Sequence, residues 1–203
     1  MIGNMEVAWE LYHRVKDIYH LSDNSLATIL EYLDIEGEYK AADSILEIGV
    51  GTAKCSEEIA DSGRDLWCVD VSKTALDRVR PFARAIHTKD LSALPTNLFD
   101  LAIEFCVVQH IDNKELYRHL KYALRSLKTT GTYALQFAYE YNGDLNDQDT
   151  HDEWTMVAGR CGRTLAFMEK AVSDNGGEVT WASIPNVNSK ILGWHSIKVR
   201  KNG

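Results

Sequence analysis

The sequence predicts an α/β fold in which a mostly parallel, doubly wound β-sheet is covered by helices on both faces. From residue 44 onward, short apolar runs rich in β-forming residues alternate with helical patterns. Several of these runs are apolar on both faces, which is typical of buried parallel strands. The composition, 45% hydrophobic with three prolines, is that of an ordered globular chain.

Two amphipathic helices are expected before the first strand. Apolar residues recur at three- and four-residue spacing over 8–19 and again over 26–33, where Ser22 or Asp23 is the expected N-cap. The expected strands after them are residues 44–48, 65–69, 85–87, 100–105 and 132–137, with helices near 54–61, 73–80 and 113–128.

The last third of the chain has a different pattern. A polar stretch over 139–153 precedes a helix expected near 153–175, which is followed by β-rich runs at 178–184 and 193–201. About ten residues without a helical pattern join these two runs, and a parallel crossover needs more. We therefore expect an antiparallel pair added to the sheet.

Length and charge limit the classes of function. The 203 residues suit one domain, which we expect to span 1–203, with helices in 1–40 and the core in 41–203. The net charge of −8, from 22 Lys and Arg against 30 Asp and Glu, disfavours nucleic-acid and membrane-surface partners. We expect a cytoplasmic protein, because no signal-peptide core or long apolar segment is visible.

The cysteines do not form a metal or disulfide pattern. No CxxC pair occurs among the four, which disfavours a zinc site and a secreted disulfide framework. They are Cys55, Cys68, Cys106 and Cys161.

A glycine-rich turn after the first expected strand is the strongest functional pattern. The run SILEI ends in Gly49-Val50-Gly51, and a helical pattern begins a few residues later. Glycines there let the backbone turn tightly and approach a ligand. Asp70 stands nineteen residues beyond Gly51, at the end of the second strand, where an acid can accept hydrogen bonds from ribose hydroxyls. Together they predict a nucleotide-like ligand.

Two common nucleotide motifs are not matched. Lys54 occupies the position at which the dinucleotide motif GxGxxG requires a small residue, which disfavours an NAD-dependent oxidoreductase. The phosphate loop GxxxxGK[ST] is absent from GVGTAKC, residues 49–55.

The glycine turn, Glu47 to Ala53, resembles the first motif of the class I S-adenosylmethionine-dependent methyltransferases, an acid followed by GxGxG, with Ala53 in place of the third glycine. Four further segments resemble motifs of this family in the same order: VDVS at 69–72, KDLSALP at 89–95, FDLAIEFCVVQHI at 99–111 and LRSLKTTGTYALQF at 124–137. The resemblance implies a Rossmann-like, seven-stranded sheet that is parallel except for its last strand. Thr129-Thr130-Gly131 departs from the family's Pro-Gly-Gly, a change expected to affect a turn.

The resemblance also implies a cofactor, S-adenosyl-L-methionine, and a product, S-adenosyl-L-homocysteine. Its small-molecule members transfer the methyl group to oxygen or nitrogen, and their N-terminal helices often close over the cofactor, so helices 1–40 are a candidate lid. The residues implied in cofactor binding are Glu47, Gly49, Val50, Gly51, Asp70, Val71, Asp90, Leu91, Glu104, Phe105 and Cys106.

Fewer residues point to the acceptor. His110, just past the fourth expected strand, is the candidate general base, since histidine titrates near neutral pH. Tyr139, Tyr141 and His151 in the polar stretch are candidate substrate contacts. No neighbourhood distinguishes the other histidines, which are His13, His20, His87, His119 and His195.

No metal ion is predicted. Acidic and amide residues between 144 and 152 invite a metal site, but the calcium-loop pattern fails because position 149 is Asp rather than Gly.

Two rival functions stay open. One is a binding or regulatory module that holds S-adenosylmethionine without catalysis. The other is a methyltransferase acting on RNA or protein, for which we would expect a basic cleft or an added recognition domain, and the sequence indicates neither.

Overall fold

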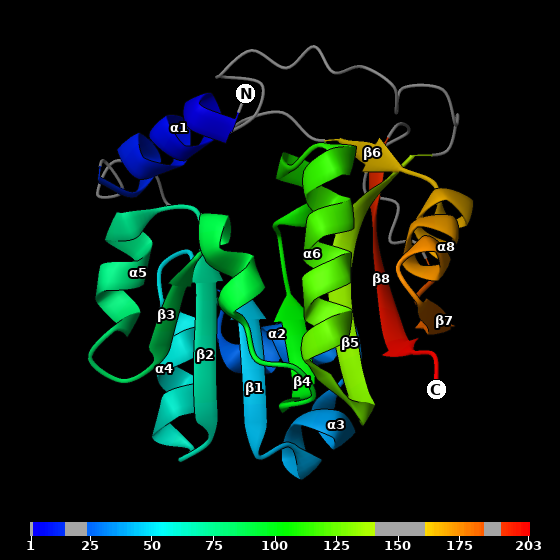
Figure 1. The fold of residues 1–203 in the computed structure, drawn as a ribbon, viewed down its shortest axis with the longest axis horizontal. Coiled ribbons are helices and arrows are strands. Elements are labelled where there is room, and N and C mark those ends of the chain that lie inside the picture. The colour runs from blue at the N-terminus through cyan, green and yellow to red at the C-terminus, as the bar shows by residue number, and fades with distance from the viewer. Residues whose placement is uncertain (1, 15–23, 141–160, 185–191) are drawn as a thin grey trace.

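The computed structural model describes residues 2–14, 24–140, 161–184 and 192–203. Its centre is one eight-stranded sheet with helices on both faces (Figure 1). The helices on both faces confirm the prediction, whereas the described residues form one strand more than the seven expected. The strand order is β3-β2-β1-β4-β5-β8-β7, and β6 pairs with β5. The strands are β1 (Ser44–Ile48), β2 (Asp65–Asp70), β3 (Arg84–His87), β4 (Phe99–Glu104), β5 (Leu127–Glu140), β6 (Gly162–Arg163), β7 (Gly177–Ala182) and β8 (Leu192–Lys201).

The first five strands are parallel to one another, as their pairing registers show. All five residues of β1 are buried, because this strand is central and covered on both faces. The chain passes from β1 outward to β2 and β3, and then returns to the other side of β1 to form β4 and β5. Strand order therefore reverses beside β1, at the place where open α/β sheets bind ligands beyond the carboxyl ends of their strands.

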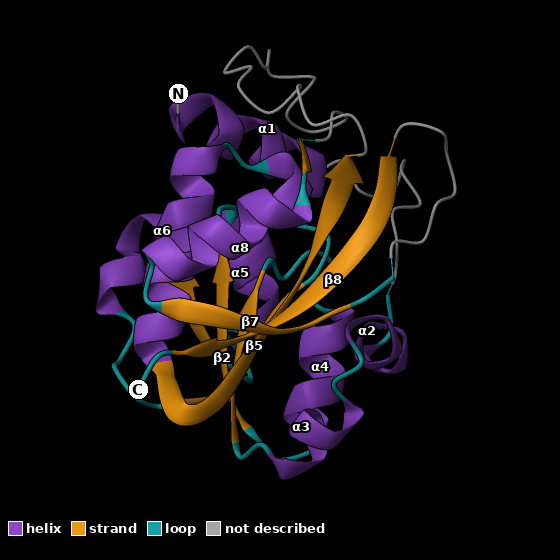
Figure 2. Cartoon of the chain, turned by 90° about the vertical axis from the view of Figure 1, so that its right-hand side faces the viewer, coloured by secondary structure: helices purple, strands orange, loops and turns teal. Residues whose placement is uncertain are grey.

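Two hydrophobic cores fill the space between the sheet and its helices. One contains apolar side chains of α6 and α8 with those of the sheet, and the other contains those of α2 to α5. Figure 2 shows α6 and α8 on one side of the strands, and α2, α3 and α4 on the other. The helices are α1 (Ile2–Arg14), α2 (Leu26–Leu33), α3 (Glu36–Ala41), α4 (Lys54–Asp61), α5 (Lys73–Val79), α6 (Asn113–Ser126) and α8 (Leu165–Asp174), with 3-10 turns η2 (Thr88–Ala93) and η3 (Val108–His110).

The antiparallel pair predicted at the end of the chain is confirmed. β8 lies between β5 and β7 and is antiparallel to both. β7 consequently runs in the same direction as β5, so β8 alone opposes the parallel strands. The short connection between β7 and β8 allows only this arrangement of neighbouring strands.

Four details of the predicted elements were wrong. A third helix, α3, precedes β1. The N-cap of α2 is Ser25, whose hydroxyl accepts from the amide of Thr28, whereas Ser22 and Asp23 lie outside the described residues. The helix predicted near 153–175 begins only at Leu165 within the described chain, because 162–163 pair with β5. β5 extends on both sides of the predicted 132–137. Its early part pairs with β4 at Phe99, and the register of this pairing shifts between Phe99 and Leu101.

In the described part of the chain, no helix has the length and apolar character needed to span a bilayer.

Candidate functional site

Many of the residues predicted to hold a cofactor follow the carboxyl ends of the parallel strands. β1 ends before Gly49, β2 ends at Asp70 and β4 ends at Glu104. Because β1 lies between β2 and β4, the segments after these strands are neighbours in space. We call this region the switch edge.

The glycine loop, residues 49–53, turns the chain from β1 into α4. A Cβ on Gly49 (φ +86°) would lie 2.1 Å from Cγ2 of Val107, so the segment after β4 packs against bare backbone there. At Gly51 (φ +56°) a Cβ would meet nothing within 4 Å. Ala53 keeps the turn with φ 72°, at a cost of about 1 kcal/mol for an L-residue. The loop is thus braced at Gly49 and open at Gly51.

Asp70 holds the glycine loop from the neighbouring strand. Its Oδ2 accepts from the amide of Val50 at 2.8 Å and from that of Gly51 at 3.4 Å, and its Oδ1 accepts from Ser72 at 2.8 Å. Each carboxylate oxygen can accept more than one hydrogen bond. Capacity therefore remains for hydroxyl donors, although Asp70 is only 7% exposed. Val71, the next residue, is half-buried.

The side chain of Glu47 lies in the interior beside α4. Its Oε2 accepts from the Ser56 hydroxyl at 2.5 Å and from the Cys68 thiol at 3.8 Å. Burial raises the pKa of Glu47 to about 7. This carboxyl group joins β1, β2 and the first turn of α4, so its contacts are with elements that carry the glycine loop.

The segment after β4 combines half-buried side chains with an unusual backbone. Cys106 has φ +58°, which is uncommon for a residue with a Cβ. Its Sγ donates to Oε1 of Gln136 on β5 at 3.2 Å. The Phe105 ring packs edge-on against Tyr32 of α2, with 5.7 Å between centroids. Phe105 and Cys106 thus follow the carboxyl end of β4 and lie at the switch edge.

Glu104, predicted to border the methyl group, has its side chain in the interior instead. It is fully buried, Oε1 lies 2.7 Å from Nδ1 of His119, and Oε2 accepts from the Tyr133 hydroxyl. The carboxylate therefore faces α6 and β5 beneath the edge. Both faces of β4 are covered, so the sequence did not reveal which face this residue takes.

His119, which sequence analysis set aside, is the partner of that buried carboxylate. Burial alone would lower its pKa, but Glu104 and then Glu115 outweigh burial and raise the pKa of His119 to about 9. Arg118 extends this network from Glu115 to the carbonyl of Thr88 in η2. The sequence hint was a histidine beside the apolar stripe of α6, four residues after a glutamate.

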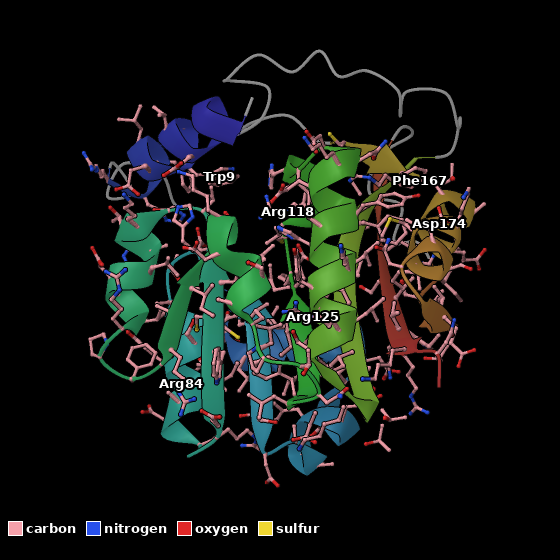
Figure 3. The ribbon with its side chains drawn as sticks, in the orientation of Figure 1. Trp9, Arg84, Arg118, Arg125, Phe167 and Asp174 are labelled. Carbon is pink, nitrogen blue, oxygen red and sulfur yellow. The ribbon has the colours of Figure 1, made fainter. Side chains whose placement is uncertain are left out.

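His110 lies in η3, directly after the segment that follows β4. It is half-buried, and its ring makes an edge-on contact with Trp9 of α1, with 5.1 Å between centroids. Trp9 projects from the side of α1 that faces the sheet (Figure 3). The candidate base therefore lies at the switch edge beneath the N-terminal helix.

Arg163 of β6, which sequence analysis missed, holds the turn that carries His110. It is 1% exposed, and it donates to the carbonyls of Val108 and Ile111, each at 2.7 Å, and to Oδ1 of Asn113 at 3.1 Å. The acceptors lie about 50 residues earlier in the chain, so no local pattern could reveal this role.

Asp90 and Leu91 both lie in η2, which follows β3, but they differ in exposure. Asp90 is exposed, whereas Leu91 is 1% exposed and belongs to the core beneath α6. Asp90 thus presents its side chain to solvent, while Leu91 contributes to packing.

The helix α1 reaches several strand ends. Glu6 pairs with Lys89 and lies 3.5 Å from Nε2 of His87, beyond β3. Glu10 accepts from the Thr74 hydroxyl at 2.6 Å, which contributes most to lowering the pKa of Glu10 to about 2. Together with Trp9 on His110, these contacts place α1 over the switch edge (Figure 1).

The remaining predicted residues are described in part or not at all. Tyr139 belongs to the end of β5, with its backbone paired to β6. Tyr141, His151 and the acidic stretch 144–152 lie outside the described residues. Within the described ranges, no group of three or more His, Cys, Asp or Glu side chains is arranged to hold a metal ion.

Comparison with protein families agrees with this geometry. A family model described as a methyltransferase domain matches residues 45–131, which include the glycine loop, Asp70 and the segment after β4. A probable non-canonical nonribosomal peptide synthetase of Salinispora arenicola, CymA, is 32% identical over 84 residues. That match spans 36% of this chain and only 1% of the synthetase.

Solved structures share the fold across almost the whole chain at low identity. The 1,6-didemethyltoxoflavin-N1-methyltransferase of Burkholderia thailandensis, solved with S-adenosylhomocysteine, has a TM-score of 0.67 and 13% identity, covering 98% of this chain and 88% of that one. An S-adenosylmethionine-dependent methyltransferase of Methanosarcina mazei has a TM-score of 0.63 and 20% identity, covering 84% and 97%.

A third structure shows that this fold also occurs in a protein named for another reaction. The cyclase SpnF has a TM-score of 0.68 and 14% identity, covering 97% of this chain and 96% of its own. The fold by itself therefore does not specify the reaction. Residues 45–131 are thus similar to a methyltransferase domain, and the chain shares the fold of solved S-adenosylmethionine-dependent methyltransferases.

Proposed function

We propose that this protein binds S-adenosylmethionine at the switch edge and transfers its methyl group to an oxygen or nitrogen of a small-molecule acceptor. The observation that carries the proposal is the glycine loop. Its amides are braced by Asp70, and the backbone at Gly51 is open. Such a loop at the switch point suits a nucleoside ligand.

The residues present fit this cofactor. Gly51 leaves room for close approach, and Asp70 retains acceptor capacity for ribose hydroxyls. Phe105 and Cys106 border the edge from β4, and Asp90 borders it from η2. Glu47 and Leu91 support these segments from the interior. When bound, the cofactor supplies an electrophilic methyl group on a sulfonium.

The chain's own task is to align the acceptor and exclude water, because such transfer depends mainly on in-line geometry. In this proposal His110, which lies against Trp9, accepts a proton from an acceptor hydroxyl or ammonium group. The Trp9 ring against His110 supplies an apolar wall on one side. We propose that α1 forms the lid of a single domain spanning residues 1–203, in the cytoplasm.

A small molecule is the acceptor class that the charges support. The net charge is −8. Several cations near the edge already have partners: Lys89 pairs with Glu6, Arg118 with Glu115, and Arg163 with main-chain carbonyls. A polyanionic RNA would need a basic surface for its phosphates.

Calorimetric titration of S-adenosylhomocysteine into the purified protein tests cofactor binding. We expect a one-to-one complex; no heat of binding up to about millimolar ligand would refute the proposal.

A pair of matched glycine variants locates the site. Gly51 and Gly63 both have positive φ and open surroundings, but Gly63 follows α4, away from the strand carboxyl ends. Gly51→Ala and Gly63→Ala should each lose about 1 kcal/mol of stability through backbone strain. Only Gly51→Ala should weaken S-adenosylhomocysteine binding, by at least about tenfold. Equal affinities in the two variants would place the site elsewhere.

Transfer of a labelled methyl group separates catalysis from binding alone. The purified protein is incubated with methyl-labelled S-adenosylmethionine and panels of phenols, amines and nitrogen heterocycles. If the wild type transfers label to an acceptor and His110→Ala does not, the result supports a general base at that position. Binding without transfer to any acceptor would favour the non-catalytic module.

A further inference from the structure

Arg78 joins the N-terminal helix to the glycine loop through a single guanidinium group. Its Nη1 donates to the carbonyl of Gly51 at 3.0 Å and lies 3.4 Å from Nδ1 of His13. Its Nη2 donates to the carbonyl of His13 at 3.0 Å. Two segments that lie far apart in the sequence thus share one side chain of α5.

The contact between α1 and α5 is reciprocal. The last carbonyls of a helix lack partners within it, and the carbonyl of His13 in the last turn of α1 receives the Arg78 guanidinium. The first amides of α5 lack partners in the same way, and Glu10 of α1 accepts from the Thr74 amide at 3.1 Å and from the Ser72 hydroxyl at 2.8 Å. A cation at a carboxyl terminus and an anion at an amino terminus both have favourable helix-dipole interactions.

The position of Gly51 gives this contact a consequence for binding. Gly51 has its amide held by Asp70 and its carbonyl held by Arg78, while the space where a side chain would lie is open. Any displacement of α1 that moves His13 therefore pulls on the guanidinium that fixes Gly51. Conversely, a ligand that orders Gly51 favours the docked position of α1.

We propose that Arg78 is a positioning residue that couples docking of α1 to cofactor binding at the glycine loop. The inference rests on the proposed function, because it takes the glycine loop as the S-adenosylmethionine site. Arg78 acts through Gly51 and His13 rather than by touching the reacting atoms. Through this side chain, docked α1 and bound cofactor stabilise each other.

Binding of S-adenosylhomocysteine to the full chain tests the coupling. Arg78→Gln should raise the dissociation constant about tenfold, the factor expected for one charge-assisted hydrogen bond. Arg78→Lys, which keeps the charge without the planar fork, should recover part of the affinity. The matched control is Arg80→Gln on the same turn, where Arg80 pairs with exposed Asp77; its affinity should equal that of the wild type.

Hydrogen exchange separates coupling from a merely structural role. S-adenosylhomocysteine should slow exchange of the α1 amides in the wild type and in Arg80→Gln. At saturating ligand it should no longer do so in Arg78→Gln. A general loss of stability would speed exchange with and without ligand and would leave the ligand-dependent slowing in place.

Each outcome decides a different statement. If the wild type binds S-adenosylhomocysteine and Arg78→Gln keeps both its affinity and its slowing, the coupling is overturned while the proposed function stands. If the wild type does not bind, the proposed function fails and the coupling fails with it. Should Arg78→Gln not fold, Glu10→Gln replaces it, because that change loosens α1 from α5 without touching Gly51, and an unchanged affinity and slowing would then overturn the proposal.

Discussion

Replacing Glu104 by glutamine removes the charge of a fully buried carboxylate but keeps its shape. In the wild type, Glu104 lies 2.7 Å from His119, and both side chains are almost completely buried. Glu115 of α6 lies 3.6 Å from the other ring nitrogen of His119, and the Tyr133 hydroxyl donates to Glu104 from β5. Glu104 is therefore the main charge that keeps His119 protonated.

The magnitude follows from the shift in the pKa of His119. Despite burial, Glu104 and Glu115 raise this pKa from 6.5 to about 9. Because the folded state holds the proton more tightly, the stabilisation is complete below about pH 6.5 and is lost as the pH rises through about 9. Each pKa unit is worth about 1.4 kcal/mol, so about 3 kcal/mol of unfolding free energy disappears across this window.

The unfolding free energy of Glu104→Gln should depend less on pH than that of the wild type, and which of the two proteins is more stable should depend on the pH. Without the Glu104 charge, the pKa of His119 falls, and the loss between about pH 6.5 and about pH 9 should shrink by more than half. Near pH 6, Glu104→Gln should be about 3 kcal/mol less stable than the wild type. Above about pH 9 the difference should vanish or reverse, because the wild type then buries an unpaired carboxylate.

Urea unfolding followed by circular dichroism, between about pH 6 and about pH 9.5, measures this difference. Tyr133→Phe is the control, since it removes a hydrogen bond and leaves the charge; its curve should parallel that of the wild type, offset by about 1 kcal/mol. Parallel curves for Glu104→Gln and the wild type would refute the buried ion pair as the source of the pH dependence.

Three further changes test the support of the switch edge. Gly49→Ala should lower the free energy of unfolding by more than about 2 kcal/mol in thermal unfolding, because its Cβ would lie 2.1 Å from Val107. Adding Val107→Ala should restore part of this stability, and an unchanged stability of Gly49→Ala would contradict the packing. Because burial raises the pKa of Glu47 to about 7, we expect the wild type to lose stability as the pH rises from about 4.5 through about 7, and Glu47→Gln should abolish that loss. Urea unfolding measures the free energy of unfolding across this range, and a pH dependence that persists in the variant would contradict this reading. Arg163→Met should cost about 3 kcal/mol in denaturant unfolding, since two buried carbonyls lose their donor, and a cost below about 1 kcal/mol would argue against this anchor.

The sequence alone located the elements that build the sheet and the loop. The run SILEI coincides with β1, and the helical pattern at 54–61 coincides with α4. Gly49, Gly51 and Asp70 lie together as their order predicted. These features were predictable because apolar periodicity, turn-forming glycines and strand-to-helix order are properties of neighbouring residues.

Tertiary structure decided which side chains face the switch edge and which support it from within. Glu104 belongs to a strand covered on both faces, where an apolar run has no alternation to reveal its orientation. The hydrogen bonds of Arg78 to Gly51 and His13 cross 27 and 65 residues. Such contacts depend on how strands and helices pack after folding, so local sequence patterns cannot predict them. The sequence thus determined the sheet and its glycine loop, and three-dimensional packing determined the side chains that hold that loop in place.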